Sequence, residues 1–297
     1  MTKKKIYLLM VCSAFFWAGA FIAGKYTVPY IPTFTLTFLR FFYATVILFF
    51  VMKWTAVDFR LQKDKLPVYL FTGVVGMFGY HVLFFTALKY TTAINTSMIA
   101  ATNPMVTTLL AFLFLRNKLG PRQIFGILLS FFGVLMTITG ADIDLLRRFS
   151  FNAGDLWMLA AVTAWAAYGV FSKSKGKGIP PVVLTYYSFL VCTVVLIPFV
   201  IFERPWELLD SIPVSAHLAV LYMSIFPSVI GYLVQQMAIK EIGPSRASIF
   251  VNLVPVFSII LAVLILGEAL EPVKLLTAAM IIIGVYICQR DRSPEKA

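Results

Sequence analysis

Apolar stretches of about 20 residues recur along this chain, and they constrain its fold more than any other feature. A helix of that length crosses roughly 30 Å of hydrocarbon. Ten such stretches lie at about 6–25, 33–53, 67–88, 94–115, 123–140, 155–172, 181–202, 214–238, 247–266 and 274–289. They are continuous rather than alternating apolar and polar residues, which favours helices over a barrel. We therefore predict an all-α integral membrane protein with ten transmembrane helices.

The composition agrees with that placement. The chain is 60% hydrophobic and 13% charged, with a mean hydropathy of +0.89. A water-soluble protein of this length needs more polar residues to cover its surface. The boundaries are least regular over 67–93, where Gly73, Gly76 and Gly79 interrupt the run, and over 214–246, where Pro227 does. The glycines fit close helix contact or a flexing point.

The sequence also repeats itself. A shift of 148 positions matches residue types that are uncommon here, placing Trp17 on Trp165, Lys25 on Lys173 and Pro32 on Pro180. A shift of 151 does the same for the second part of each half, placing Lys89 on Lys240, Pro104 on Pro255 and Pro121 on Pro272. Paired membrane halves of this kind are typical of secondary transporters, which bind substrate between the repeats. We expect two five-helix repeats, 1–146 and 147–297.

The distribution of basic residues predicts how the helices are threaded. With a cytoplasmic N-terminus, cytoplasmic segments hold 18 of the 25 Lys and Arg residues, outer segments hold six, and Arg40 lies within a span. This bias fits a multi-pass protein of the cell membrane with both termini cytoplasmic. The loop after span one carries only Lys25, whereas its repeat partner carries Lys173, Lys175 and Lys177. The two halves are therefore expected to be inverted, and the net charge of +12 requires no nucleic acid partner.

Two further features concern processing and cofactors. Residues 1–24 resemble a signal peptide, but they have an internal counterpart at 156–172, so we expect them to remain as the first span. The cysteines, Cys12, Cys192 and Cys288, all fall within spans and have neither disulfide nor metal-site spacing. We expect no cofactor and no metal, and a monomer or homodimer surrounded by lipid.

Arg40 is the most informative polar residue inside a span. It lies eight residues into the second stretch, about 12 Å along a helix at ~1.5 Å per residue. A permanently charged guanidinium at that depth requires a wet cavity or an acceptor. It could bind a carboxylate or another anionic group of a substrate, or it could clamp carbonyls at a helix end. Its repeat position is Ser188, so a site built on Arg40 is asymmetric.

Spans three and eight carry polar side chains at matching depths. Span three has Tyr80 and His81, and span eight has Tyr232, Gln235 and Gln236. Tyr232 shares a helix face with either glutamine by spacing. Together these donors and acceptors could hold a zwitterionic or polar substrate. His81 could relay protons or could be a satisfied structural residue.

Spans four and nine combine small polar residues with a proline in mid-span. Asn103 and Asn252 each lie close to a proline, Pro104 and Pro255 respectively. Proline removes a backbone donor and frees a carbonyl, and matched interruptions in two halves point to a central site. The alternative is plain interhelical packing by small, hydrogen-bonding residues.

Trp17 and Trp165 are matched tryptophans within their spans, each followed by small residues. Membrane tryptophans usually lie at the interface with water. These two lie about a dozen residues from one end of their spans, so we expect them to line a cavity, with core filling as the alternative. Tyr168 shares a face with Trp165 and is a further candidate.

The paired tryptophans, the matched prolines and the turn at 266–272, Leu-Gly-Glu-Ala-Leu-Glu-Pro, resemble the EamA-type carriers of the drug/metabolite transporter superfamily. The resemblance covers the whole chain as two EamA-like halves. It implies ten helices in inverted repeats, a cavity lined by spans one, three, four, six, eight and nine, and spans five and ten at the periphery. It also implies transport of small organic metabolites, including amino acids. The Gly267-Glu268 turn has Arg116-Asn117 as its counterpart, so we expect Glu268 to have a structural role.

These features favour a secondary transporter for a small polar metabolite, with an amino acid or related compound as the expected substrate. The chain has no Gly-x-x-x-x-Gly-Lys phosphate loop for ATP hydrolysis. An integral-membrane lipid-modifying enzyme would need acids, histidines or metal ligands gathered at one depth, and the chain offers only His81 and His217 as histidines. A channel is the other alternative. We therefore expect a carrier rather than an enzyme.

Overall fold

The structure is a computed structural model, and it describes residues 3–58, 60–115, 119–140, 142, 152–176, 178–208, 211–242 and 250–290. Every regular element in these ranges is a helix. Eight of the described helical segments are long and apolar enough to cross a membrane. Two further apolar helices are shorter, Leu253–Leu266 and Pro272–Cys288. The predicted all-α membrane fold is therefore confirmed.

The first half of the described chain contains seven α-helices: α1 (Lys3–Thr27), α2 (Thr33–Trp54), α3 (Leu66–Phe71), α4 (Tyr80–Tyr90), α5 (Ala93–Ala100), α6 (Asn103–Leu115) and α7 (Pro121–Thr139). The second half contains α9 (Ala153–Lys175), α10 (Pro181–Glu203), α11 (Val214–Met223), α12 (Gly231–Ile242), α14 (Leu253–Leu261) and α15 (Pro272–Arg290). Short 3₁₀ turns, Lys63–Lys65 and Pro205–Glu207, precede α3 and follow α10.

Two interrupted runs in the sequence are continuous helices in the structure. The π-helical segment η2 (Thr72–Gly79) joins α3 to α4, and η5 (Ser224–Ile230) joins α11 to α12. A third π-helical segment, η6 (Ala262–Leu266), follows α14. The wider turn of a π-helix absorbs the residues that cannot hold the α-helical ladder, among them Pro227. Glycine and proline therefore change the helix type here without ending the helix.

The glycines of η2 also allow close packing. A Cβ atom on Gly73 would lie 2.5 Å from Val191 of α10, and one on Gly76 would overlap the ring of Tyr168 of α9. A larger residue at either position would push these helices apart. The close-contact interpretation of these glycines therefore holds at Gly73 and Gly76.

The prolines of spans four and nine lie where helices begin again. A turn at Ala101 and Thr102 separates α5 from α6, and Pro104 is the second residue of α6. Asn252 is a turn residue before α14, in which Pro255 is the third residue. The first turn of a helix needs no backbone donor, so proline fits there. Each proline therefore follows a break in its span rather than interrupting a continuous helix.

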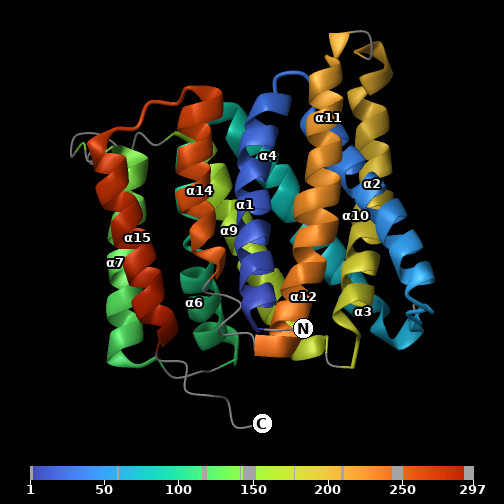
Figure 1. The fold of residues 1–297 in the computed structure, drawn as a ribbon, viewed down its shortest axis with the longest axis horizontal. Helices are drawn as coiled ribbons and strands as arrows, with labels where there is room; N and C mark the ends of the chain where they lie inside the picture. The colour runs from blue at the N-terminus through green and yellow to red at the C-terminus, as the bar shows by residue number, and fades with distance from the viewer. Residues whose placement is uncertain are drawn as a thin grey trace.

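The helices form one bundle with α7 and α15 packed together along one edge (Figure 1). Their contact depends on glycines, since a Cβ on Gly126 would lie 2.5 Å from the carbonyl oxygen of Gly284. At the opposite side α2 packs on α10. Between these edges α1 packs on α12 and α14, and α9 packs on α4 and α6. The first turn of α1 and the last turn of α15 lie at the same end of the bundle.

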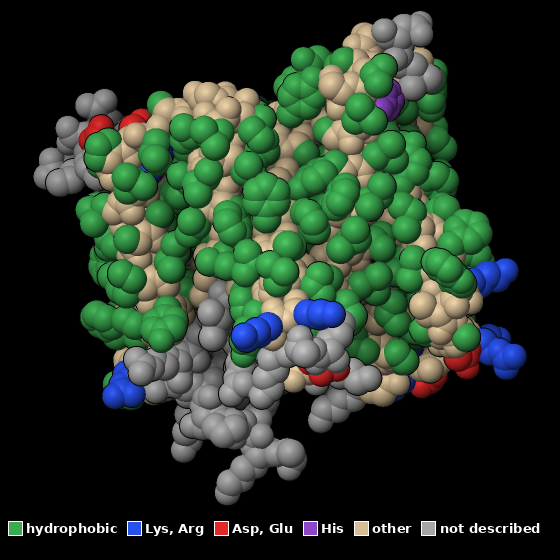
Figure 2. Space-filling model, in the orientation of Figure 1, with side chains coloured by type: hydrophobic (Ala, Val, Ile, Leu, Met, Phe, Trp, Pro, Cys, Tyr) green, Lys and Arg blue, Asp and Glu red, His purple; other side chains and the backbone are tan. Residues whose placement is uncertain are grey.

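Apolar side chains cover the middle of the visible face, and most of the Lys and Arg side chains seen there lie along its lower edge (Figure 2). Large exposed apolar residues occur on several helices, including Phe50 of α2, Phe202 of α10 and Leu264 of η6. A continuous apolar face of this kind belongs in hydrocarbon rather than in water. The chain is therefore a multi-pass membrane protein.

Candidate functional site

A cavity of about 320 Å³ lies between the helices of the bundle. Its walls come from α1, α2, α4, α5, α6, α9, α12 and α14. Nine of the eleven predicted site residues line it: Trp17, Arg40, Tyr80, His81, Asn103, Trp165, Tyr232, Gln235 and Asn252. Residues far apart in the sequence thus reach one cavity, and their role in binding a substrate stays a prediction.

The remaining two predicted residues are placed differently. Tyr168 is not among the residues that line the cavity. Its ring is tilted by 35° to that of Trp165, with centroids 4.9 Å apart, and packs against Gly76. The side chain of Gln236 lies outside the described part of the structure. Phe21 and Phe84 also line the cavity and were not predicted, because nothing in the sequence separates a cavity phenylalanine from a core one.

Arg40 is buried, with 5% of its surface exposed. Its Nε donates to the hydroxyl of Ser228, 3.1 Å away, and that hydroxyl donates to the carbonyl of Met223 at 2.9 Å. The guanidinium carbon lies 5.6 Å from the ring centroid of Phe41 and 5.9 Å from that of Phe85. Among the described residues, Ser228 is its one hydrogen-bond partner, and no acid lies within ion-pair distance. The clamp on carbonyls that the sequence allowed is therefore not formed in this part of the chain.

Aromatic rings gather beside Arg40. The ring centroids of Tyr80 and Trp165 are 4.8 Å apart, and those of Trp165 and Tyr232 are 6.3 Å apart. Phe84 stacks on Tyr80 and meets Phe21 edge to face, with centroid distances of 5.9 and 5.1 Å. These rings give the cavity flat, apolar walls that a planar ligand can contact.

Trp17 is oriented by the other half of the chain. Its indole Nε1 donates to the carbonyl of Pro227 in η5, at 3.0 Å. Gly231 makes room for the indole, because a Cβ there would lie 2.7 Å from the same nitrogen. A π-helical turn leaves carbonyls without their usual helical donors, and the indole satisfies one of them.

His81 has the environment of a structural histidine that also touches the cavity. Its Nδ1 lies 2.9 Å from the carbonyl of Met77, one helical turn earlier. A carbonyl only accepts, so Nδ1 carries the proton in this contact. The ring is buried edge to face against Phe41, with centroids 4.6 Å apart. The geometry favours the structural interpretation over a proton relay.

Amides line the cavity from α6, α12 and the turn before α14, and α6 and α12 lie toward the end of the bundle where α1 begins (Figure 1). Asn103 and Thr107 are one turn apart on α6, and the threonine hydroxyl donates to Asn103 Oδ1 at 3.3 Å. Gln235 and Asn252 line the same region from α12 and the turn before α14. Thr96, on α5, is buried, and its hydroxyl donates to the carbonyl of Thr92 at 2.9 Å.

The opposite end of the bundle, which we call the Lys25 end, is held together by polar contacts. Lys25 donates to the carbonyls of Leu88 and Thr91 at 2.8 and 2.7 Å. Glu268 accepts from the backbone of Ala93 at 2.7 Å and from the next residue at 3.0 Å. Asp155 accepts from the hydroxyl of Thr91 at 2.7 Å. One corner between α4 and α5 is thus tied to α1, α9 and the turn before α15.

The sequence only partly revealed this end. Glu268 has the structural role expected, but its partners lie 175 residues away, at the free backbone donors of α5. Glu203 does the same for α2, accepting from Thr35 N at 2.7 Å. From the sequence, Lys25 was treated only as a loop charge. The one sequence signal for these polar contacts was Lys25, which lies at the end of a span and matches Lys173 in the repeat.

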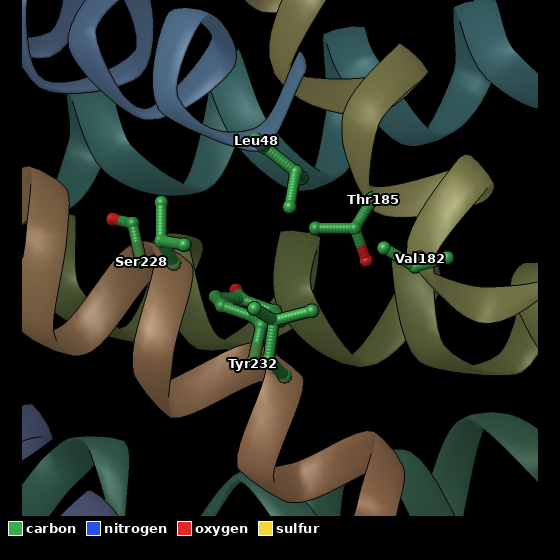
Figure 3. Close-up of a pocket in the computed structure, with 7 residues that line it drawn as sticks. Leu48, Val182, Thr185, Ser228 and Tyr232 are labelled. Carbon is green, nitrogen blue, oxygen red and sulfur yellow. The ribbon is translucent and has the colours of Figure 1, made fainter. Parts of the chain in front are cut away.

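A second gap lies between α2, α10 and the η5–α12 region (Figure 3). Leu48, Thr185 and Tyr232 point into it from three directions. It has no room for a water molecule. The central cavity is therefore the candidate site.

The sequence profile of the EamA-like transporter family matches residues 4–139 and again residues 152–289. The chain belongs to this family. It is similar to the uncharacterized transporter YyaM of Bacillus subtilis (strain 168), with 33% identity over 96% of this chain and 93% of the relative. It is also similar to an uncharacterized transporter of Archaeoglobus fulgidus, with 29% identity over 96% of this chain and 97% of the relative.

A crystal structure of another protein resembles the fold, with a TM-score of 0.66 and 21% identity over 96% of each chain. That likeness concerns the fold alone. Family and composition together make this EamA-like protein a membrane transporter of the cell membrane. The resemblance that was read from the tryptophans, the prolines and the turn at 266–272 is confirmed.

Proposed function

We propose that this EamA-like protein is a secondary carrier that moves a small polar metabolite, an amino acid or a related compound, by alternating access. In this proposal ten spans form two inverted repeats, 1–146 and 147–297, with both termini cytoplasmic. The substrate binds in the central cavity. Arg40 holds an anionic group, while Tyr80, Tyr232, Gln235, Asn103 and Asn252 supply further hydrogen bonds and Trp17 and Trp165 provide aromatic walls.

Several features support the repeat. The family profile matches twice, once in each half. The π-helical segments η2 and η5 fall at equivalent positions, because a shift of 151 carries Gly73–Gly79 onto Ser224–Ile230. Helix partners are exchanged in the same way: α1 packs on α12 and α14, while α9 packs on α4 and α6. Such an exchange of partners is what a two-fold relation between halves produces.

The polar contacts at the Lys25 end support alternating access. They join elements of both halves on one side of the cavity, whereas the amide-lined region lies toward the end where α1 begins. We propose that the Lys25 end is the closed outer side of this conformation. Rocking of the halves would break these contacts and open the cavity to the outside.

The buried, charged Arg40 on a cavity wall carries the proposal. A guanidinium in a bilayer interior is costly unless something compensates for it, and an anionic substrate group would do so. The test is counterflow in proteoliposomes that contain purified protein, with a panel of radiolabelled amino acids and organic acids. A carrier gives saturable uptake that is accelerated by unlabelled substrate inside.

Arg40→Gln should lower that uptake by about tenfold or more, since the variant loses a charge-assisted hydrogen bond to the substrate. Arg60→Gln is the matched control, because Arg60 is an exposed loop residue. Equal uptake by both variants and the unchanged protein would remove Arg40 from the site. Linear, unsaturable flux without counterflow would replace the carrier by a channel.

A further inference from the structure

The charges that surround the central cavity are unbalanced. Arg40 is the single charged side chain among the described residues that line it. Residues 116–118 and 243–249, which lie outside the described chain after α6 and α12, contain no Asp or Glu in their sequence. No described Asp or Glu lines the cavity, and Asp155 and Glu268 are engaged at the Lys25 end by Thr91 and by the start of α5.

Arg40 has hydrogen-bonding capacity to spare. A guanidinium has five N–H donors, and Nε uses one of them on Ser228. Within the described chain the two terminal nitrogens of Arg40 make no hydrogen bond. Neither is among the fully buried atoms that lack a partner, and Arg40 lines the cavity. Two parallel donors of this kind match the two oxygens of a carboxylate.

A cationic group on the ligand would have no such partner. An ammonium inside the cavity would meet Arg40 in a low-dielectric interior, and like charges there repel strongly. The polar atoms available to it are amide and hydroxyl groups such as those of Asn103, Thr107 and Gln235. An ammonium loses its hydration when it enters the cavity, and a carboxylate could compensate for that loss. Neutral hydrogen-bond acceptors compensate for less of it.

The remaining wall selects the body of the ligand. The rings of Tyr80, Phe84 and Trp165 form a connected aromatic surface, with neighbouring centroids 4.8 and 5.9 Å apart. At about 320 Å³ the cavity is close to the lower limit of ligand pockets, roughly 300 Å³. A single small ring with a short chain fits this size and these flat walls.

We infer that the site takes small aromatic monocarboxylates that carry one negative charge and no ammonium group, rather than zwitterionic amino acids. The inference rests on the proposed function, because it names the substrate class of the same cavity. In this inference the substrate is an aromatic monocarboxylate related to an amino acid, rather than the amino acid itself. The carboxylate binds the terminal nitrogens of Arg40, and the ring packs against Tyr80 and Trp165.

Four probes of similar size test this inference with the wild-type protein in detergent: 3-phenylpropanoate, phenylalanine, 2-phenylethylamine and 3-cyclohexylpropanoate. Calorimetry should give 3-phenylpropanoate about tenfold tighter binding than phenylalanine, which adds an unpaired ammonium, and no binding of 2-phenylethylamine. The cyclohexyl acid should bind about threefold or more weakly, since it lacks the contacts between aromatic rings. Phenylalanine that binds as tightly as 3-phenylpropanoate, or failure of 3-phenylpropanoate to bind, overturns the inference.

Variants locate the binding. Arg40→Gln should lose affinity for 3-phenylpropanoate by about tenfold or more, whereas Arg40→Lys keeps the charge and should lose less. Arg60→Gln, outside the cavity, should bind as the unchanged protein does. Affinity that is unchanged in a folded Arg40→Gln protein contradicts the assignment. Comparison of the four probes with unaltered protein remains decisive if the variant does not fold.

Counterflow separates this inference from the proposed function. Binding of 3-phenylpropanoate without any counterflow in proteoliposomes would support the ligand class and overturn the carrier function. Counterflow of phenylalanine with no preference for the acid would support the carrier and overturn the ligand class. Saturable counterflow of 3-phenylpropanoate that is not inhibited by tryptophan or by cationic amines supports both the carrier function and the ligand class.

Discussion

Arg40 shows how a single charge is kept in a bilayer interior. Its burial would be prohibitive without partners, and the described partners are one hydroxyl and two aromatic rings. Ser228 belongs to η5 of the other half, so the orientation of the guanidinium depends on how the halves are docked. A different docking of the two halves would therefore change how Arg40 is held.

Replacing Ser228 tests this dependence at the residue scale. Ser228→Ala leaves Arg40 Nε without its acceptor, and we expect substrate affinity to fall by about threefold to tenfold as the guanidinium loses its orientation. Ser224→Ala is the control, because the one hydrogen bond of that buried hydroxyl within the described residues goes to the carbonyl of Val220 in its own helix, at 2.8 Å. Calorimetry and thermal melting together distinguish loss of binding from loss of fold. Unchanged affinity in Ser228→Ala would mean that Ser228 does not position Arg40.

The residue types were predictable, and their partners were not. Trp17, Trp165, Asn103 and Asn252 stand out in so apolar a chain, and all four line the cavity. The bond from Arg40 to Ser228 spans 188 positions, and helical periodicity carries no information over that distance. Tyr168 shares a helix face with Trp165 but packs against Gly76. Its place outside the cavity was not predictable, because residue spacing does not say how far a helix face extends into a cavity.

At the scale of elements, carboxylates from one half cap helices of the other. Glu268 satisfies two backbone donors at the start of α5, and Glu203 satisfies two at the start of α2. A carboxylate there also interacts favourably with the helix dipole. These contacts fix the start of each capped helix relative to the neighbouring half.

Removing one cap should loosen the Lys25 end. Glu268→Ala is expected to lower the free energy of unfolding by about 1–2 kcal/mol, the usual effect of losing a helix cap. It should also raise the reactivity of a cysteine placed at Ser97, inside the cavity, toward an impermeant reagent added outside. Glu271→Ala alters an exposed acid three residues away and should do neither. Equal behaviour of the two variants would contradict a role for Glu268 in closing this end.

The contact between α7 and α15 depends on having no side chain at its centre. A Cβ on Gly284 would lie 2.5 Å from the hydroxyl of Ser130 and 2.7 Å from the carbonyl oxygen of Gly126. Gly284→Ala should therefore destabilise the fold by about 1–3 kcal/mol. Gly169→Ala is the matched control, since nothing lies within 4 Å of a Cβ there, and it should be neutral or stabilising by about 0.5–1 kcal/mol. Equal melting temperatures would show that the helix pair adjusts freely.

At the scale of the whole molecule, apolar length was enough to predict the helices. Eight described helical segments and two shorter apolar ones coincide with the stretches expected from the sequence. The π-helical segments were not predicted, because glycine and proline signal an interruption without saying whether the helix continues. The exact helix breaks at Thr102 and Asn252 escaped prediction for the same reason.

Inversion of the two halves is the claim on which the carrier depends, because it places one shared cavity between two oppositely oriented bundles. Tyr26 and Ser174 are repeat equivalents at a shift of 148, and both are exposed at the ends of α1 and α9. The most direct measurement is labelling of Tyr26→Cys and Ser174→Cys in cells by an impermeant maleimide, after replacement of Cys12, Cys192 and Cys288. We predict that the cysteine at 26 reacts in intact cells and the one at 174 only after permeabilisation. Reaction of both from the same side would contradict the inverted repeat and the carrier built on it.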